Sequence, residues 1–229
     1  LGLAAFWALF RLVPAAPPLP AVVPGTFRQM LVEPRLLRLN LGVFILHAIQ
    51  IAMWVAVPAL LIQLAGLPLQ QHWMIYVPAV VASFFVLWPA MMQAERHQRM
   101  AQVFAFAVVL IGLVQLGFGL LVGREGLSQF LAISMILLLI AVFFTGFNIL
   151  EALQPSLISR IAPATGKARA LGIYNTLQSL GLFVGGAMGG WLLQSGGYAA
   201  VFAGCGLLAT IWLIILLKWP ARVPAKTPT

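Results

Sequence analysis

The positions of the basic residues relative to long apolar stretches constrain the fold of this chain most strongly. Six apolar stretches are each long enough to cross a bilayer, which takes about 20 residues of helix. If they cross in turn, twelve of the 13 Lys and Arg residues fall on one side, and only Arg124 falls on the other. The twelve are Arg11, Arg28, Arg35, Arg38, Arg96, Arg99, Arg160, Lys167, Arg169, Lys218, Arg222 and Lys226. This sorting follows the positive-inside rule and predicts a multi-pass α-helical membrane protein with cytoplasmic basic loops.

The composition excludes several other classes of protein. The chain is 62% hydrophobic and 7% charged, whereas soluble domains carry about 25% charged residues. Its net charge of +9 is spread over short loops, which suits an anionic lipid surface better than nucleic acid. Its one cysteine, Cys205, lies in an apolar run that predicts packing, and the three His residues lack zinc-site spacing. We therefore expect no nucleic-acid partner, no metal and no cofactor.

The charge pattern divides the chain into four parts. Residues 1–13 are apolar but too short to span, and they predict the end of an earlier membrane helix. The Pro-rich segment 14–38 predicts a cytoplasmic linker with a short interfacial helix over 26–32. Residues 39–219 predict a six-helix membrane unit, and 220–229 a cytoplasmic tail. The predicted crossings are 39–63, 72–92, 101–122, 129–160, 170–194 and 198–219.

Glu151 is the outstanding polar residue at membrane depth, in the inner part of the fourth crossing. It follows Asn148 and lies one turn before Pro155, which removes a backbone hydrogen bond and kinks the helix. A charge inside a crossing is costly and marks a functional site by default. Because burial favours the neutral form of a carboxyl group, Glu151 is a candidate proton or substrate site. The alternative is a structural anchor, paired with a loop Arg or bonded to helix amide groups.

A second candidate site lies on the first crossing. His47, Gln50 and Trp54 share one helix face, which would give a cavity donors, acceptors and an aromatic platform. The alternative is that His47 only bonds to a neighbouring helix. Further polar candidates are Gln115, Asn148, Asn175 and Gln178.

Glycines form a face on the fifth crossing. Gly181, Gly185 and Gly189 make two overlapping GxxxG steps, with Gly186 and Gly190 beside them. Without Cβ atoms, this face admits a neighbouring helix at close range. It predicts either tight static packing or a surface that slides between conformations, and the two roles can coexist.

The basic loops supply candidates for a gate. Glu95, Arg96 and Arg99 lie between the second and third crossings, and Arg160 and Arg169 flank the loop after the fourth. One interpretation is a latch, with Glu95 near a helix N-terminus and Arg99 paired with an acid. The other is a solvated loop that only sets the topology.

Several composite motifs point to a known family. They are LNLGVFILH at 39–47, HW at 72–73, EALQPSLIS at 151–159, ALGIYNTLQSLG at 170–181, and the glycine pairs before Trp191. Together they resemble the carboxy-terminal half of the YajR-like branch of the major facilitator superfamily. The resemblance implies a transporter of two six-helix halves that works by alternating access. This chain would hold the end of helix 6, the central linker and helices 7–12.

The resemblance also implies function and partners. Members of this branch are regarded as proton-driven efflux pumps, so the expected partners are an amino-terminal six-helix half, the inner-membrane bilayer, protons and a small-molecule substrate. The family's signature loop would correspond here to Glu95, Arg96 and Arg99, without its usual Gly and Asp. That departure weakens the latch interpretation.

Two classes of function follow from the sequence. The first is the carboxy-terminal half of a proton-coupled efflux antiporter. The second is a non-transporting membrane scaffold that binds a partner through its glycine faces. The sequence has no nucleophile beside a base, no paired acids and no metal cluster, so we do not expect an enzyme.

Overall fold

The computed structural model describes Trp7, Arg11 and residues 27–124 and 126–218. Within these ranges all regular structure is helical, which confirms the predicted all-α membrane fold. The elements are α2 (Phe27–Val32), α3 (Pro34–Gln63), η1 (Leu69–Gln71), α4 (Trp73–Arg96), α5 (Met100–Leu121), α6 (Gln129–Ile161), η2 (Ala164–Gly166) and α7 (Lys167–Lys218).

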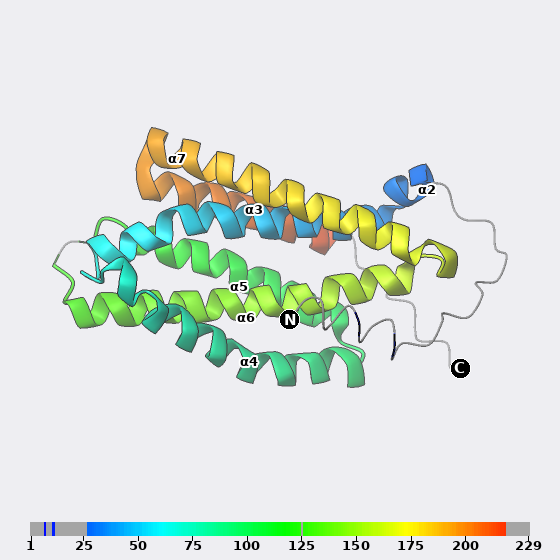
Figure 1. Cartoon of the computed structure of the whole chain (residues 1–229), viewed down its shortest axis with the longest axis horizontal. Helices are drawn as coiled ribbons and strands as arrows, with labels where there is room; N and C mark the ends of the chain where they lie inside the picture. The colour runs from blue at the N-terminus through cyan, green and yellow to red at the C-terminus, as the bar shows by residue number, and fades with distance from the viewer. Residues whose placement is uncertain (1–6, 8–10, 12–26, 125, 219–229) are drawn as a thin grey trace.

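The helix α7 supplies two of the six crossings. Five helices of the described chain are long and apolar enough to cross a membrane. The last of them, α7, has 52 residues and a non-helical backbone at Gly197, with φ 67° and ψ −164°. Figure 1 shows the chain reversing direction there, so that the two halves of α7 run side by side. The sixth predicted crossing is therefore the second half of α7.

Two helix starts follow local capping rules. Ser128 caps α6 by accepting a hydrogen bond from the Leu131 amide at 3.3 Å. The Glu33 carboxylate caps α3 by accepting from the Leu36 amide at 2.9 Å, and Pro34 takes the first helical position. As a result α3 begins five residues before the predicted crossing, so residues 34–38 of the predicted linker are helical.

Other predicted boundaries agree closely with the helices. α2 matches the short helix expected over 26–32, and α6 runs for 33 residues, or about 50 Å. This exceeds the roughly 30 Å of bilayer hydrocarbon, so α6 must tilt or project from it. Trp7 and Arg11 are helical. The rest of the predicted helix end, most of the linker and the tail from 219 lie outside the described residues.

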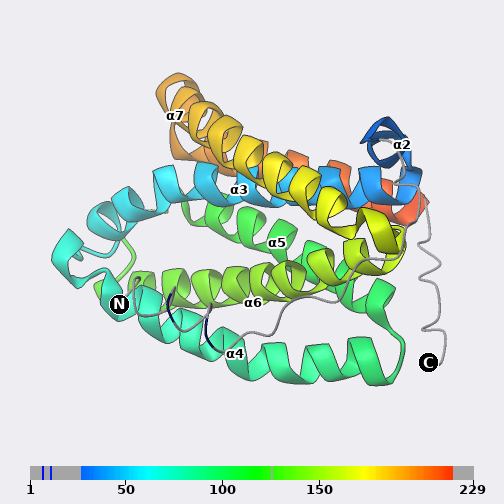
Figure 2. The same ribbon diagram turned by 45° about the vertical axis from the view of Figure 1, so that its right-hand side comes forward.

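The helix α3 packs mainly against α7. α3 lies against both halves of α7, α5 packs on α6 and α7, and α4 packs mainly on α6. In Figure 2 the C-terminal part of α4 diverges from the α3–α7 layer. Cys205 is fully buried and free, as expected for a packing residue.

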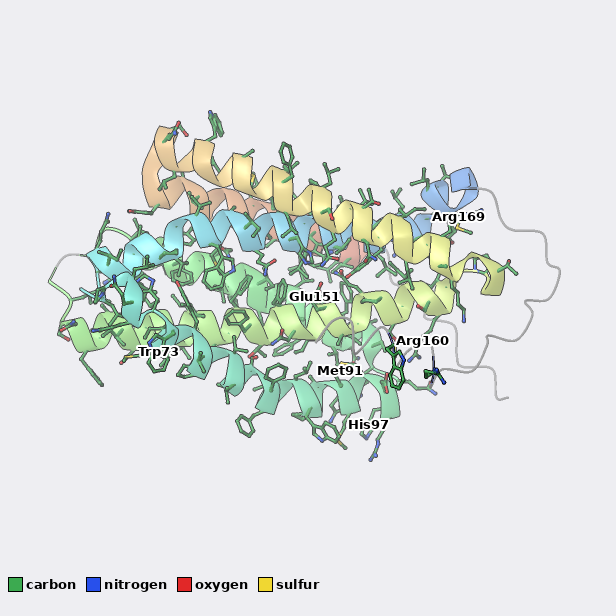
Figure 3. The ribbon with its side chains drawn as sticks, viewed as in Figure 1. Trp73, Met91, His97, Glu151, Arg160 and Arg169 are labelled. Atoms are coloured by element: carbon green, nitrogen blue, oxygen red, sulfur yellow. The ribbon has the colours of Figure 1, made fainter. Side chains whose placement is uncertain are left out.

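Charge separates the two ends of the bundle. We call "the basic end" the end at which α3 and α7 start and α4 and α6 finish. Figure 3 places His97, Arg160 and Arg169 there, Trp73 at the opposite end, and Glu151 between them. The described basic residues at this end include Arg35, Arg38, Arg96, Arg99, Arg160, Lys167, Arg169 and Lys218, whereas Arg124 follows α5 at the other end.

The glycine face of α7 is filled by α3. A Cβ atom added at Gly181 would overlap the Phe44 carbonyl, and one at Gly185 the Ala48 carbonyl. A Cβ at Gly189 would lie 2.7 Å from the Cα atom of Ala52. The glycine spacing of four thus matches Phe44, Ala48 and Ala52 on α3.

The other two predicted glycines make looser contacts. A Cβ at Gly186 would meet only Ile51, at 3.5 Å, and one at Gly190 would meet nothing within 4 Å. Three of the five glycines therefore set the distance between the two helices.

The turn at Gly197 can be tested directly. Its φ and ψ lie in a region that is essentially restricted to glycine, while a Cβ there would meet nothing within 4 Å. Gly197→Ala should therefore destabilise the protein by backbone strain alone, by about 1–3 kcal/mol. Gly172→Ala is the matched control, because Gly172 is helical and equally open. Thermal unfolding of both variants in detergent checks this, and equal stabilities would contradict the assigned turn.

Candidate functional site

An acid and an imidazole face each other in the bundle interior. His47 of α3 is 3% exposed, and its Nε2 atom lies 3.6 Å from Oε1 of Glu151 on α6. Gln178 of α7 reaches the same ring, with its amide nitrogen 2.8 Å from His47 Nε2. Three helices therefore contribute to one buried polar cluster.

Hydrogen bonding fixes which nitrogen of His47 can exchange a proton. Nδ1 lies 3.0 Å from the Val43 carbonyl oxygen, which can only accept, so Nδ1 carries a hydrogen. Proton exchange is thereby confined to Nε2. When the ring is neutral, Nε2 accepts from the Gln178 amide or from a protonated Glu151. When the ring is charged, Nε2–H can donate to the Glu151 carboxylate.

Glu151 retains capacity for another ligand. Its side chain is 32% exposed, but the Oε1 atom that faces His47 is buried and has no hydrogen-bond partner among the described residues. Tyr174 of α7 interacts with this carboxyl group and also donates to Oε1 of Gln154 at 3.2 Å. The carboxyl group thus keeps one buried oxygen that a proton would satisfy.

Aromatic rings from three helices lie two turns from this pair, toward the opposite end of the bundle. Trp54 of α3 meets Tyr76 of α4 edge to face at 4.9 Å between centroids, and Phe144 of α6 at 5.9 Å. Phe147 links the two regions, since its ring lies 5.6 Å from that of His47. We call Trp54, Tyr76 and Phe144 the aromatic cluster.

The other predicted polar residues differ in their contacts. Asn148 joins the facing helices by donating to the Ser83 hydroxyl of α4 at 2.8 Å. Gln50 is half-buried on α3, and no hydrogen bond of its side chain is seen within the described chain. Gln115 is 1% exposed and its amide nitrogen lies 3.6 Å from the Met53 sulfur, so it packs in the core.

Some site residues carried little or no sequence signal. Tyr174 and Gln178 lie four apart, hence on one face of α7, and that spacing could have linked them. Gln178 was a candidate only as a polar residue, without an indication that it contacts His47. Ser83, Tyr76 and Phe144 lie among apolar residues in the sequence. Only the packing of α4 and α6 places them beside the candidate site.

Two of the loop candidates form an ion pair. Glu95 lies in the last turn of α4, not at a helix N-terminus, and its carboxylate lies 3.5 Å from the guanidinium group of Arg160. The side chains are 55% and 31% exposed, and such surface pairs contribute only about 0–1 kcal/mol. Arg96 ends α4, and Arg99 directly precedes α5.

Arg169 lines a cavity at the basic end. The cavity has a volume of about 390 Å³ and lies between α2 and the start of α7. Its lining is otherwise mostly apolar and includes Leu31, Ile173 and Leu177. Figure 3 shows Arg169 and Arg160 at different places of the basic end.

Comparison with known proteins gives consistent relatives. The Major Facilitator Superfamily model matches residues 39–229. The inner membrane transport protein YajR of Escherichia coli K12 is 37% identical over 194 residues, covering 85% of this chain and 41% of that protein. An uncharacterized transporter of Buchnera aphidicola subsp. Acyrthosiphon pisum is 29% identical over 148 residues, 65% of this chain and 36% of that protein.

A relative with a more specific name also matches. The multidrug resistance protein MdtH of Escherichia coli O9:H4 (strain HS) is 28% identical over 162 residues, 69% of this chain and 36% of that protein. The chain therefore spans about two fifths or less of the length of these relatives.

Proposed function

Because the chain belongs to the Major Facilitator Superfamily, we propose that it is the carboxy-terminal half of a proton-coupled efflux antiporter. Its relatives are named as transport and multidrug resistance proteins, and the match covers 41% of the first. An amino-terminal six-helix half would complete the molecule and close the other side of the transport cavity. Residues 1–13 would end helix 6, 14–38 would be the linker, 39–219 the six-helix half, and 220–229 the tail.

The facing of His47 and Glu151 is the observation that carries the proposal. Both are titratable, both are held at membrane depth, and one carboxylate oxygen lacks a hydrogen-bond partner in the described chain. Glu151 then serves as a shared site, where a proton and a substrate group exclude each other. This exclusion would give antiport, because the site must release the proton before it binds the substrate, and the substrate before it binds a proton.

The charge pattern supports an orientation in the inner membrane. Eight described basic residues lie at the basic end of the bundle and Arg124 lies at the other, so we assign the basic end to the cytoplasm by the positive-inside rule. The Glu95–Arg160 pair then lies at the cytoplasmic mouth. There the ion pair connects α4 to α6, and breaking it would cost little free energy because both side chains are partly exposed.

The scaffold alternative loses its main support. The glycines expected to bind a partner at Gly181, Gly185 and Gly189 already hold α3. The glycines of α7 at which a Cβ would meet nothing within 4 Å are Gly172, Gly190 and Gly197, and these do not form the predicted face.

Transport by the full-length protein tests the proposal. In everted membrane vesicles energised to an acidic interior, acridine orange reports proton release on addition of compounds from a drug panel. We expect compound-dependent dequenching with the wild type and none with Glu151→Gln. If no compound acts while a stoichiometric membrane partner co-purifies with the protein, the scaffold interpretation replaces ours.

A further inference from the structure

We propose that the cavity between α2 and the start of α7 binds an anionic phospholipid, with the lipid phosphate at Arg169 and one acyl chain along α7. We call this cavity the α2–α7 groove. Its volume of about 390 Å³ falls within the range of small-ligand pockets, roughly 300–1,000 Å³. The transport proposal makes no use of this part of the molecule.

The α2–α7 groove lies on the outside of the bundle. Figures 1 and 2 show α2 on the side of the α3–α7 layer opposite to α4 and α6. The groove is therefore remote from the His47–Glu151 pair, which joins α3 to α6. Because α2 is a short helix of the kind that lies at a membrane interface, the groove lies where lipid headgroups meet hydrocarbon.

The groove follows one stripe of α7 that changes from charged to apolar. Four of its lining residues lie at positions i, i+3, i+4 and i+7, hence on one helix face; they are Arg169, Gly172, Ile173 and Thr176. Seven residues of helix correspond to about 10 Å along the axis. The stripe thus has a cationic group at its outer end and runs from there toward the membrane interior.

The inner part of the groove suits an acyl chain. Leu31 of α2 and Ile173 and Leu177 of α7 form its apolar walls. The Thr176 hydroxyl donates to the Gly172 carbonyl oxygen of its own helix at 2.9 Å, so its hydrogen needs no ligand. Apart from Arg169, the lining therefore presents mainly apolar contacts.

Gly172 leaves the space that the chain would occupy. A Cβ added at this position would meet nothing within 4 Å. Gly172 is helical and does not have a positive φ, so its backbone conformation does not require glycine. The missing side chain instead keeps the groove open one turn from Arg169.

The charges around the groove favour an anion. Arg169 lines it, Lys167 and Arg35 lie in the first turns of α7 and α3 at the same end, and its described lining contains no Asp or Glu. Glu33, which follows α2, accepts from the Arg35 and Leu36 amides and caps α3. Basic pockets between membrane helices on the cytoplasmic side bind anionic lipid headgroups.

A lipid in the groove would also hold α2 against the bundle. Met30 is 2% exposed and fills the space beside Gly166, where a Cβ would overlap it. Leu31 is next to it on α2 and is 37% exposed. An acyl chain would cover Leu31, so α2 would contact the protein through Met30 and the lipid through Leu31.

Photolabelling of the full-length transporter in nanodiscs tests the proposal. The probe is phosphatidylglycerol with a diazirine in the middle of one acyl chain, and mass spectrometry identifies the labelled peptides. We expect label on α2 and on residues 169–177 of α7. Unlabelled phosphatidylglycerol should compete about fivefold better than phosphatidylethanolamine with the same chains, as expected for one basic residue near the membrane surface. Inorganic phosphate should not compete.

Two variants separate the headgroup contact from the chain contact. Arg169→Gln should reduce the difference between the two lipids to about twofold or less and leave the label in place. Lys218→Gln is its control, because Lys218 lies at the same end outside the groove. Gly172→Leu should reduce labelling at least about fivefold, because its side chain would fill the groove. Gly190→Leu changes an equally open glycine outside the groove and should keep wild-type labelling.

Three outcomes would overturn the proposal. Equal competition by the two lipids in the wild type would do so without depending on any variant. Label absent from both α2 and residues 169–177 would show that another part of the full-length protein covers the groove. Competition by inorganic phosphate would indicate a site for a free anion in place of a lipid. None of these outcomes depends on Glu151, so the transport proposal is tested separately.

Discussion

Replacing Glu151 with glutamine in the full-length transporter should reduce pH-gradient-driven transport by about a hundredfold or more, comparable to loss of a proton-transfer group elsewhere. Glutamine keeps the size and the hydrogen-bonding capacity of the side chain but cannot bind and release a proton. His47→Gln should have a similar effect, because Nε2 is the proton-exchanging atom of the pair. Initial transport rates in proteoliposomes, with and without a pH gradient, measure the effect.

Controls separate coupling from folding. His97→Gln changes the same residue type in an exposed loop at the basic end and should retain wild-type rates. Both Glu151→Gln and His47→Gln should remain folded, with unfolding temperatures close to that of wild type. If Glu151→Gln transports with an unchanged dependence on the pH gradient, Glu151 is a structural anchor instead.

Gly185→Leu should prevent α3 and α7 from packing. Even a Cβ atom at this position would overlap the Ala48 carbonyl of α3. The Ala48 carbonyl is a backbone group, so it cannot move away by a rotamer change as a side chain could. We expect a loss of about 3 kcal/mol or more, at the upper end of overpacking penalties, and mostly misfolded protein. The smaller change Gly185→Ala should cost about 1–3 kcal/mol.

Gly190 offers the matched control on the same helix. A Cβ there meets nothing within 4 Å, so Gly190→Ala should change stability by about 0.5 kcal/mol or less, as surface substitutions usually do. Denaturant titration in mixed micelles compares the variants. Similar losses at 185 and 190 would show that the α3–α7 contact is not the source of the effect. They would also remove our reason for assigning the glycine spacing to helix packing.

The crossings could be predicted because lipid imposes them. Apolar length and charge sorting are properties of each segment by itself, so they located α3 to α6 and both halves of α7. The start of α3 was harder to predict, because the helix extends beyond the apolar stretch to Pro34, where Glu33 caps it. Capping depends on local hydrogen bonds that hydropathy does not register.

The site was predictable only in part, for a related reason. His47 and Glu151 each stand out as polar residues in apolar helices, yet nothing in the sequence indicates that they face each other. That pairing depends on the rotation and depth of α3 against α6, which the glycine contacts with α7 help to set. Gln115 shows the converse, since a polar residue in a crossing can simply pack against Met53.

The partner of Glu95 could not be predicted from the loop. The structure brings Arg160 from the end of α6 to Glu95, because α4 packs along α6. Contacts between segments 65 residues apart cannot be found from loop composition alone.

Infrared difference spectroscopy tests most directly whether Glu151 exchanges a proton. The spectrum of full-length wild type minus that of Glu151→Gln, recorded across pH 5 to 9 in proteoliposomes, isolates the carboxyl stretch of this one residue. We predict a protonated-carboxyl band that disappears as pH rises, and whose midpoint moves in His47→Gln. A difference spectrum with no such band over the whole range would mean that Glu151 stays ionised, and would contradict proton exchange at this site.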